Sequence, residues 1–204
     1  ESSNLSPNSP YAATKTSADH LIISYYKTFN FPAIIARSSN NYGPFQFPEK
    51  LIPLIILNAL ENKKLPLYGN GKHVRNWLYV EDNVNALKKV LFKGKKGNIY
   101  NIGGKEEISN LVLIRKICKI LDTILPRENK KRYESLIEFV SDRPGHDKRY
   151  SLNSNKIKKE LKWKPEIDLN LGLKLTINWY LENKKWWNPI RKFKYKGERL
   201  GKNR

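Results

Sequence analysis

Tyr11 and Lys15 are the first pair of residues whose types and spacing could do chemistry. Residues four apart lie on one face of a helix. A tyrosine is protonated at neutral pH, because its ordinary pKa is about 10, and a neighbouring ammonium favours the phenolate form. Such a tyrosine can take a proton from a hydroxyl group while a hydride leaves the same carbon. Most pairs with this spacing lie on an ordinary helix surface, so the pair gains meaning only from what accompanies it.

A polar loop with two adjacent amides, Asn40 and Asn41, follows a short apolar run that begins at Ala33. Loops at the carboxyl ends of strands are where open α/β sheets bind ligands. Amides offer hydrogen-bond donors and acceptors without charge. An ordinary turn rich in asparagine is the plainer interpretation of this loop taken alone.

Two arginines stand at the edges of other expected elements. Arg75 precedes an expected strand, and Arg143 stands in the turn Asp142-Arg143-Pro144-Gly145-His146 beside His146. Arginine grips phosphate groups with two hydrogen bonds at once, so two arginines on separate loops suit a diphosphate. Each arginine alone is more simply a surface ion pair.

Helical and strand patterns alternate along the chain, which predicts an α/β fold. Ser9 and Pro10 form a strong helix start. The expected helices are 11–29, 49–62, 84–92, 111–125, 153–161 and 169–182; the expected strands are 33–37, 65–68, 77–80, 99–102 and 137–140; the segment 40–48 is expected to be a loop.

The composition bounds the class of protein. The 204 residues are enough for one domain with a small lobe, and no apolar run approaches the roughly 20 residues of a membrane span. The only cysteine, Cys118, excludes an internal disulfide and fits a cytoplasmic location. The formal charge of +20 suggests a polyanion partner, but the lysine pairs are scattered, which favours solvated surfaces. Because the chain starts with Glu1 and has no methionine, we expect a fragment or a processed product.

Several motifs together resemble the extended short-chain dehydrogenases, and among them the dTDP-glucose 4,6-dehydratases. The resemblance runs from about Ser6 to Trp187, nearly the whole chain. The motifs that carry it are Ser9-Pro10-Tyr11-Ala12-Ala13-Thr14-Lys15, Ser39-Asn40-Asn41-Tyr42-Gly43-Pro44, Phe47-Pro48-Glu49-Lys50-Leu51, Asn76-Trp77-Leu78-Tyr79-Val80-Glu81-Asp82, Tyr100-Asn101-Ile102-Gly103-Gly104 and Asp142 to Asp147.

The resemblance implies a Rossmann-type fold with a smaller nucleotide-sugar-binding lobe, NAD as cofactor, dTDP-glucose as substrate, a homodimer, and neither metal, nucleic acid nor membrane as a partner. It implies that residues 1–48 end the NAD-binding domain and that 49–183 form mostly the substrate lobe, with interleaved returns to the sheet. The basic composition of residues 184–204 predicts a loosely ordered tail, on which Trp186 and Trp187 are candidates to dock on the body. Tyr11 would be the base, and Lys15 and Asn41 would join it in contacting NAD. The implied substrate contacts are Asn40, Lys50, Leu51, Pro66, Leu67, Tyr68, Arg75, Asn110, Asp142, Arg143 and His146.

In the family reaction a hydride leaves C4 of the sugar, water is eliminated across C5 and C6, and the hydride returns to C6. The glycine-rich NAD loop is absent from this sequence, and so is the Asp-Glu pair that relatives use for the elimination. Asn76 stands where relatives commonly carry Asp. A UDP-sugar epimerase or decarboxylase of the same superfamily remains an alternative. A basic nucleic-acid-binding module is a remote alternative, because no zinc-finger or ribonucleoprotein motif supports it.

Overall fold

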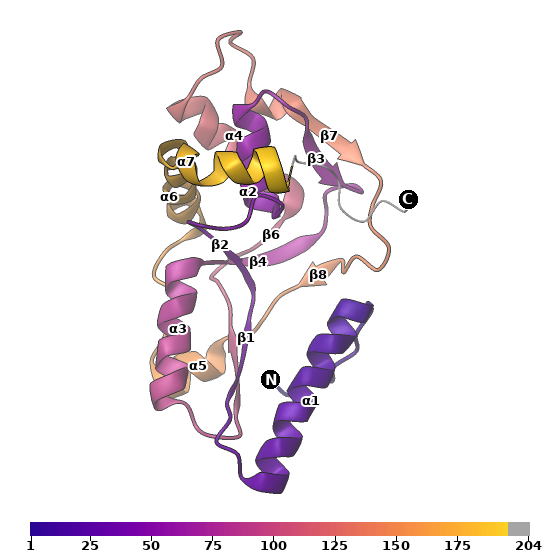
Figure 1. The fold of residues 1–204 in the computed structure, drawn as a ribbon, viewed down its shortest axis with the longest axis vertical. Helices are drawn as coiled ribbons and strands as arrows, with labels where there is room; N and C mark the ends of the chain where they lie inside the picture. Colours follow the sequence, from indigo (N-terminus) through magenta and orange to yellow (C-terminus); the bar gives the residue numbers. More distant parts are fainter. Residues whose placement is uncertain (196–204) are drawn as a thin grey trace. The chain divides into compact units, whose positions relative to one another are not determined.

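The computed structural model describes residues 1–195, which form two compact units of mixed helix and strand (Figure 1). The first unit comprises residues 1–41, 75–107 and 144–167, and the second unit comprises 42–74, 108–143 and, within the described residues, 168–195. The elements are α1 (Pro10–Phe29), β1 (Ile35–Ser38), β2 (Asn40–Tyr42), α2 (Leu51–Leu60), β3 (Leu65–Tyr68), β4 (Val74–Tyr79), α3 (Val80–Lys93), β5 (Ile99–Ile102), β6 (Glu107–Ser109), α4 (Asn110–Ile124), η1 (Tyr133–Leu136), β7 (Ile137–Val140), β8 (Arg149–Tyr150), α5 (Asn155–Leu161), α6 (Leu169–Glu182), α7 (Lys184–Pro189) and the π-helical turn η2 (Ile190–Lys194).

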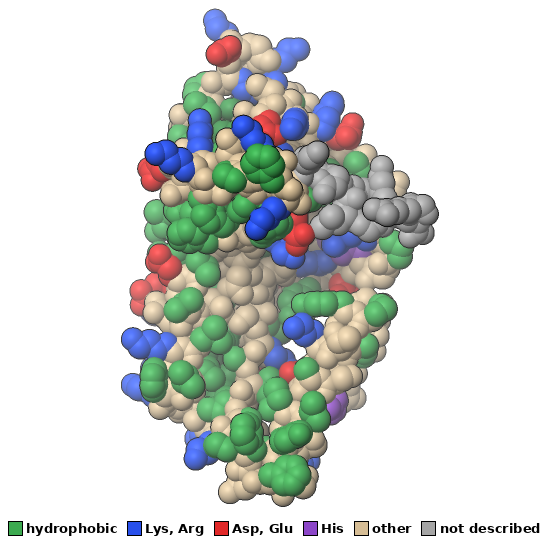
Figure 2. Space-filling model, viewed as in Figure 1, with side chains coloured by type: hydrophobic (Ala, Val, Ile, Leu, Met, Phe, Trp, Pro, Cys, Tyr) green, Lys and Arg blue, Asp and Glu red, His purple; other side chains and the backbone are tan. Residues whose placement is uncertain are grey.

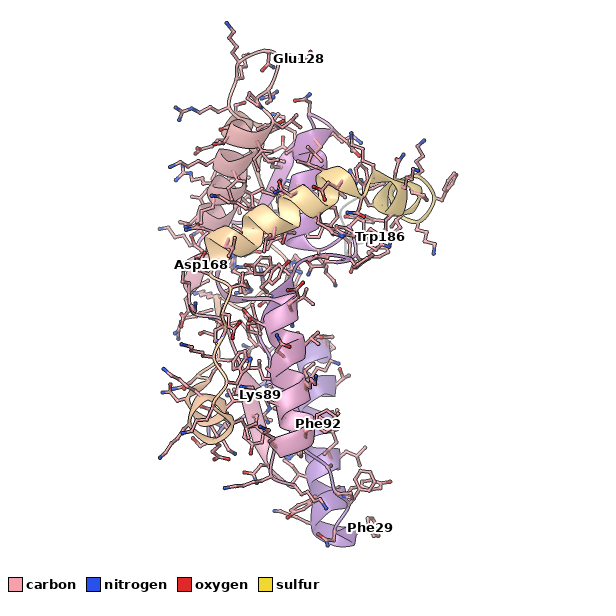
Figure 3. The ribbon with its side chains drawn as sticks, turned by 90° about the vertical axis from the view of Figure 1, so that its left-hand side faces the viewer. Phe29, Lys89, Phe92, Glu128, Asp168 and Trp186 are labelled. Carbon is pink, nitrogen blue, oxygen red and sulfur yellow. The ribbon has the colours of Figure 1, made fainter. Side chains whose placement is uncertain are left out.

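Helix α1 begins where the sequence predicts. The Ser9 hydroxyl accepts a hydrogen bond from the Ala12 amide at 3.2 Å, and proline occupies the first helical position. The helix ends at Asn30, whose φ of 52° lies in the left-handed region that commonly terminates helices. No side chain of α1 is buried, and Figure 3 shows Phe29 projecting from its end. The apolar side chains along α1, visible in Figure 2, are therefore open to solvent.

The first unit contains a parallel pair of strands, β1 and β5, with Ile35 opposite Ile99. One face of this pair is apolar and packs in a buried cluster with side chains of α3 and α5. The other face carries Arg37, whose Nε donates a hydrogen bond to Asp19 of α1 at 2.6 Å. Both side chains of this ion pair are only 19% exposed. The pair therefore fixes α1 to the strand, although no residue of α1 is fully buried.

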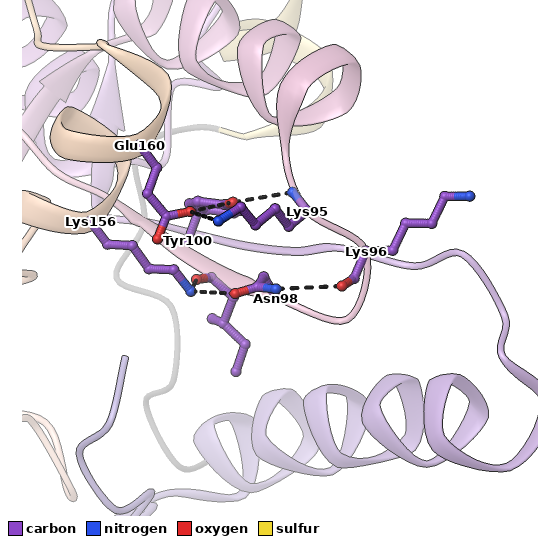
Figure 4. A network of polar contacts seen from close by, with 7 residues as sticks. Lys95, Lys96, Asn98, Tyr100, Lys156 and Glu160 are labelled. Carbon is purple, nitrogen blue, oxygen red and sulfur yellow. Dashed lines mark hydrogen bonds and ion pairs between the residues drawn. The ribbon is translucent and has the colours of Figure 1, made fainter.

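A polar network joins β5 to α5 (Figure 4). The Tyr100 hydroxyl donates to Glu160 at 3.0 Å and accepts from the Lys95 amide at 3.1 Å. Lys156 donates to the Asn98 side chain at 2.8 Å and lies over the Tyr100 ring. Burial, reinforced by the Glu160 carboxylate, raises the pKa of Tyr100. Tyr100 is therefore a protonated, structural tyrosine.

A second sheet contains β2, β4 and β6 in that order, with β8 also paired to β4. The prediction of a loop over 40–48 is thus wrong for its first three residues, which form β2. They form a strand because β4 supplies hydrogen-bond partners for their backbone, and a local sequence pattern cannot predict this pairing. The expected strand ending at Val80 is also one residue too long. Val80 begins α3, whose first turn contains Glu81 and Asp82, where acidic residues favour the helix dipole.

Asn76 on β4 is 2% exposed and uses its whole carboxamide. Its amide nitrogen donates to the carbonyl oxygens of Gly104 at 3.1 Å and Glu106 at 2.9 Å. Its oxygen accepts from the Gly104 amide at 2.7 Å. The side chain therefore fixes the turn between β5 and β6. A carboxylate could accept there but could not donate.

We expect Asn76→Asp to lower the free energy of unfolding by about 2 kcal/mol or more, because two buried carbonyl oxygens would lose their donor and face a charge. Urea denaturation followed by circular dichroism measures this difference. Asn85→Asp is the matched control, since Asn85 is exposed on α3. If the two variants unfold at the same urea concentration, the Asn76 hydrogen bonds do not stabilise the fold as described.

The second unit is built around α2, in which every residue from 52 to 59 is buried. Helices α4 and α6 pack against α2 and against each other. Beside them β3 pairs in parallel with β7, with Tyr68 opposite Val140. An apolar run that is buried on all sides explains why the sequence 51–57 shows no amphipathic pattern.

The segment expected to be a loosely ordered tail is helical over 184–194, as α7 and η2; residues 196–204 lie outside the described part of the chain. Trp187 is 7% exposed, and its indole nitrogen donates to the Tyr180 carbonyl at 2.7 Å. Arg191 reaches Asn58 at 3.0 Å and Glu61 at 2.8 Å. These tertiary contacts order a sequence whose basic composition alone favours a solvated tail.

Candidate functional site

The Tyr11–Lys15 pair lies on one face of the first turns of α1, as the spacing predicts. The Lys15 Nζ lies 5.7 Å from the centre of the Tyr11 ring. Tyr11 is 72% exposed, so its hydroxyl group is open to a ligand. Tyr150 of β8 interacts electrostatically with Tyr11. Burial has the largest effect on Tyr150 and raises its pKa, and the nearby hydroxyl of Tyr11 raises the pKa further.

Unsatisfied polar atoms gather at the carboxyl end of β1. Within residues 1–195, the Ser39 hydroxyl and the carboxamide oxygens of Asn40 and Asn101 are buried without a hydrogen-bond partner. Asn41 donates to the Ser39 carbonyl at 3.2 Å, which orients its side chain. Buried polar groups are almost always paired, so unpaired ones at this strand end indicate a place where a ligand supplies the partner.

Arg75 connects β4 to the segment after residue 144. Its Nη2 donates to the Asp147 carbonyl at 2.8 Å, and the Asp147 side chain accepts from Asn8 at 3.2 Å. His146, next to Asp147, is half-buried. The first unit therefore brings Arg75 and the loop that contains His146 to the start of the helix that carries Tyr11.

In the second unit, β3 presents Pro66 and Tyr68 on one face and buries Leu67 on the other. Leu67 is 1% exposed, whereas Pro66 and Tyr68 are half-buried. Only Pro66 and Tyr68 can therefore offer side chains to a ligand on this face, and Leu67 can contribute its backbone. The alternation along a strand explains the difference.

Arg143 lies against this same strand. Its guanidinium carbon is 5.2 Å from the centre of the Tyr68 ring, a distance typical of cation–π contact. The Asp142 carboxylate accepts from the Arg143 amide at 2.8 Å and lies against the turn at Gly69, whose φ is +57°. The structure thus brings Tyr68, Asp142 and Arg143 together.

Asn110 is the first residue of α4, which Ser109 caps. It is 6% exposed, and its carboxamide oxygen has no hydrogen-bond partner within the described residues. A buried acceptor of this kind suits a ligand N–H or O–H group. Lys50 and Leu51 lie at the start of α2, where Lys50 is exposed and pairs with Glu49 at 2.7 Å.

Sequence reasoning missed His73. This residue is 7% exposed, and its Nε2 lies 3.0 Å from the Asp142 carboxylate. Its carbonyl oxygen accepts from the Asn110 amide at 2.9 Å. A histidine in a glycine-rich turn carries no periodic signal, so only the folded chain shows that it touches two of the predicted substrate residues.

On the face shown in Figure 2, lysine and arginine side chains are dispersed over each unit and do not form one block. Among residues 1–195, no helix is long and apolar enough to cross a membrane.

Solved structures with a similar fold include nucleotide-sugar enzymes that were crystallised with NAD. The dTDP-glucose 4,6-dehydratase of Bacillus anthracis, solved in complex with NAD, matches with a TM-score of 0.85 and 47% identity, over 93% of this chain and 58% of that chain. The UDP-glucuronic acid 4-epimerase of Bacillus cereus, solved with UDP-glucuronic acid and NAD, matches with a TM-score of 0.76 and 29% identity, over 89% and 57%. The expected Rossmann-type α/β fold is confirmed.

The chain belongs to the GDP-mannose 4,6-dehydratase family, whose model matches residues 1–176. Among curated relatives, the dTDP-glucose 4,6-dehydratase of Escherichia coli is 50% identical over 203 residues, which cover 98% of this chain and 56% of the relative. That of Neisseria meningitidis serogroup B is 47% identical, over 98% and 57%. The resemblance inferred from the motifs is confirmed, and the chain spans a little over half the length of these relatives.

Proposed function

We propose that this chain supplies the catalytic tyrosine and the nucleotide-sugar grip of a dTDP-glucose 4,6-dehydratase, which converts dTDP-glucose to dTDP-4-keto-6-deoxyglucose. The observation that carries the proposal is the 50% identity to the Escherichia coli dehydratase along almost the whole chain. The arrangement of Tyr11, Lys15 and the two groups of predicted substrate residues supports it.

The first unit would carry the redox half of the reaction. Tyr11 would accept the proton of the sugar 4-hydroxyl, and the Lys15 ammonium would favour its phenolate form and hold ribose hydroxyls. Bound NAD would accept the hydride at C4 and return it at C6. The open Tyr11–Lys15 face and the amide of Asn41 fit the hydroxyl- and amide-bearing end of that cofactor.

Each unit contains predicted substrate contacts. In the second unit, Arg143 would pair with the diphosphate, while Pro66, Tyr68 and Asn110 would contact the nucleoside. Lys50, Leu51 and Asp142 belong to the same predicted set. In the first unit, Asn40, Arg75 and His146 would complete the contacts.

The sequence supplies neither a glycine-rich dinucleotide loop nor the acidic pair that relatives use for the elimination. We therefore expect the 204-residue chain alone to show no turnover. We place the active protein in the cytoplasm, in keeping with the free, buried Cys118, whose pKa burial raises to about 12. We also expect the homodimer that the resemblance implies.

The test is a completed enzyme, in which this chain follows the part of the Escherichia coli relative that it does not cover. With NAD and dTDP-glucose, the completed enzyme should form the 4-keto-6-deoxy product, identified by NMR. The Escherichia coli part alone is the control. Conversion of a UDP-sugar to its 4-epimer instead, with dTDP-glucose untouched, would assign the chain to the epimerases. No product from either sugar, with a folded protein, would contradict the proposal.

A further inference from the structure

His73 touches the predicted nucleotide grip at two points, and both lie within the second unit. The imidazole Nε2 of His73 lies 3.0 Å from the Asp142 carboxylate. The backbone carbonyl oxygen of His73 accepts a hydrogen bond from the backbone N–H of Asn110 at 2.9 Å. Since a carboxylate only accepts, the Nε2 atom must carry the hydrogen. One buried residue therefore contacts both the loop after β7 and the start of α4.

Asp142 is held at both of its oxygens. One oxygen faces His73, and the other accepts from the Arg143 amide at 2.8 Å. The carboxylate also lies against Gly69, where an added Cβ would come within 3.0 Å of it. These contacts fix the backbone from which the Arg143 side chain reaches the ring of Tyr68.

The turn between β3 and β4 holds His73 in place. The Gly69 amide donates to the Val140 carbonyl at 2.8 Å, which extends the β3–β7 pairing by one residue. The Leu111 amide donates to the Gly71 carbonyl at 3.0 Å. Gly71 has a φ of +71° and leaves no room for a Cβ beside Leu67. The turn is therefore tied to β7 on one side and to α4 on the other.

We propose that His73 is a positioning residue for nucleotide binding. In this role it sets the Asp142–Arg143 backbone through its imidazole and the first turn of α4 through its own carbonyl oxygen. The proposal rests on the proposed function, because it assigns His73 to the dTDP site of that function. The proposed ligand is a nucleoside diphosphate. Its phosphates need the Arg143 guanidinium in a fixed position, and its nucleoside needs the Asn110 carboxamide in a fixed position.

A pair of amide variants tests the position of the donor. A glutamine places its side-chain nitrogen about where the histidine Nε2 lies, whereas an asparagine is one methylene shorter and falls short of Asp142. We expect His73→Gln to bind dTDP within about threefold of the wild-type chain, and His73→Asn about tenfold or more weakly. Isothermal titration of the 204-residue chain with dTDP measures both affinities, and circular dichroism checks that both variants fold.

A double-mutant cycle separates positioning from general destabilisation. If His73 acts through Arg143, then His73→Asn should weaken dTDP binding by less than about threefold in a chain that already carries Arg143→Ala. In the completed enzyme, His73→Asn should raise KM for dTDP-glucose and leave kcat at saturation within about twofold, whereas partial unfolding would lower kcat.

Several results would overturn the inference. Equal dTDP affinities of the glutamine and asparagine variants would show that the bond to Asp142 does not matter, as would a full tenfold loss on the Arg143→Ala background. A wild-type chain that binds no dTDP would instead contradict the proposed function, and the inference with it. If the wild-type chain binds dTDP and the two variants bind it with equal affinity, the proposed function stands and only the role of His73 is wrong. The two outcomes are therefore distinguishable.

Discussion

Tyr11→Phe in the completed enzyme should reduce turnover of dTDP-glucose by about 100-fold or more, because the phenylalanine ring cannot accept the proton of the sugar hydroxyl. Affinity for dTDP should stay within about threefold, since Tyr11 is 72% exposed at the start of α1 and the residues expected to bind the nucleotide are unchanged. Steady-state assays with dTDP-glucose and titration with dTDP measure the two quantities.

Tyr25→Phe is the matched control for the loss of a tyrosine hydroxyl from the same helix. Tyr25 is 49% exposed, and its ring contacts Phe29 and Phe31, which a phenylalanine would preserve. Its turnover should equal that of the parent enzyme. A Tyr11→Phe enzyme that turns over within a few-fold of the parent would remove Tyr11 from the role of base.

Arg143→Ala should weaken binding of dTDP by about 10- to 100-fold, because a charge-assisted contact with a diphosphate contributes about 1.5–3 kcal/mol. Turnover at saturating dTDP-glucose should change by less than about threefold, since Arg143 is expected to hold the nucleotide and not the reacting carbon. The change would appear in KM, and titration with dTDP should show the same factor.

Arg115→Ala controls for the loss of a positive charge from the second unit. Arg115 is exposed on α4 and pairs with Glu134 at 2.7 Å. It should leave dTDP affinity unchanged at physiological salt, because its charge is exposed to solvent and already paired with Glu134. If Arg115→Ala and Arg143→Ala weaken binding equally, the effect is one of net charge, and the assigned contact with Tyr68 and the diphosphate is wrong.

Local rules were enough for most helices and strands. The cap at Ser9, the proline after it and the left-handed Asn30 fix the ends of α1 without help from distant residues. Strand β7 and helix α6 also lie where apolar spacing predicts. Two of the errors occurred where pairing or docking decides: β2 needs β4 as a partner, and the helix at 184–189 is secured by Trp187, whose indole nitrogen donates to the Tyr180 carbonyl.

In the candidate site too, local spacing predicts some features and only tertiary contacts create the others. The Tyr11–Lys15 spacing follows from helix geometry, so the sequence was sufficient for it. The contact of Arg143 with Tyr68 joins residues 75 positions apart, and no local pattern predicts it. Leu67 was expected beside the ligand, yet the pleat of β3 turns its side chain into the core. The roles of all these residues stay predictions until the variants are measured.

The sequence by itself determined the elements, the chemistry available to Tyr11, Lys15 and the arginines, and the resemblance to nucleotide-sugar dehydratases, because these depend on residue type and short-range spacing. Only the tertiary structure decided that His73 holds Asp142 and Asn110, and that Asn76 fixes the turn before β6. Such bonds join residues far apart in the chain, and their strength depends on burial, which is created when the chain folds.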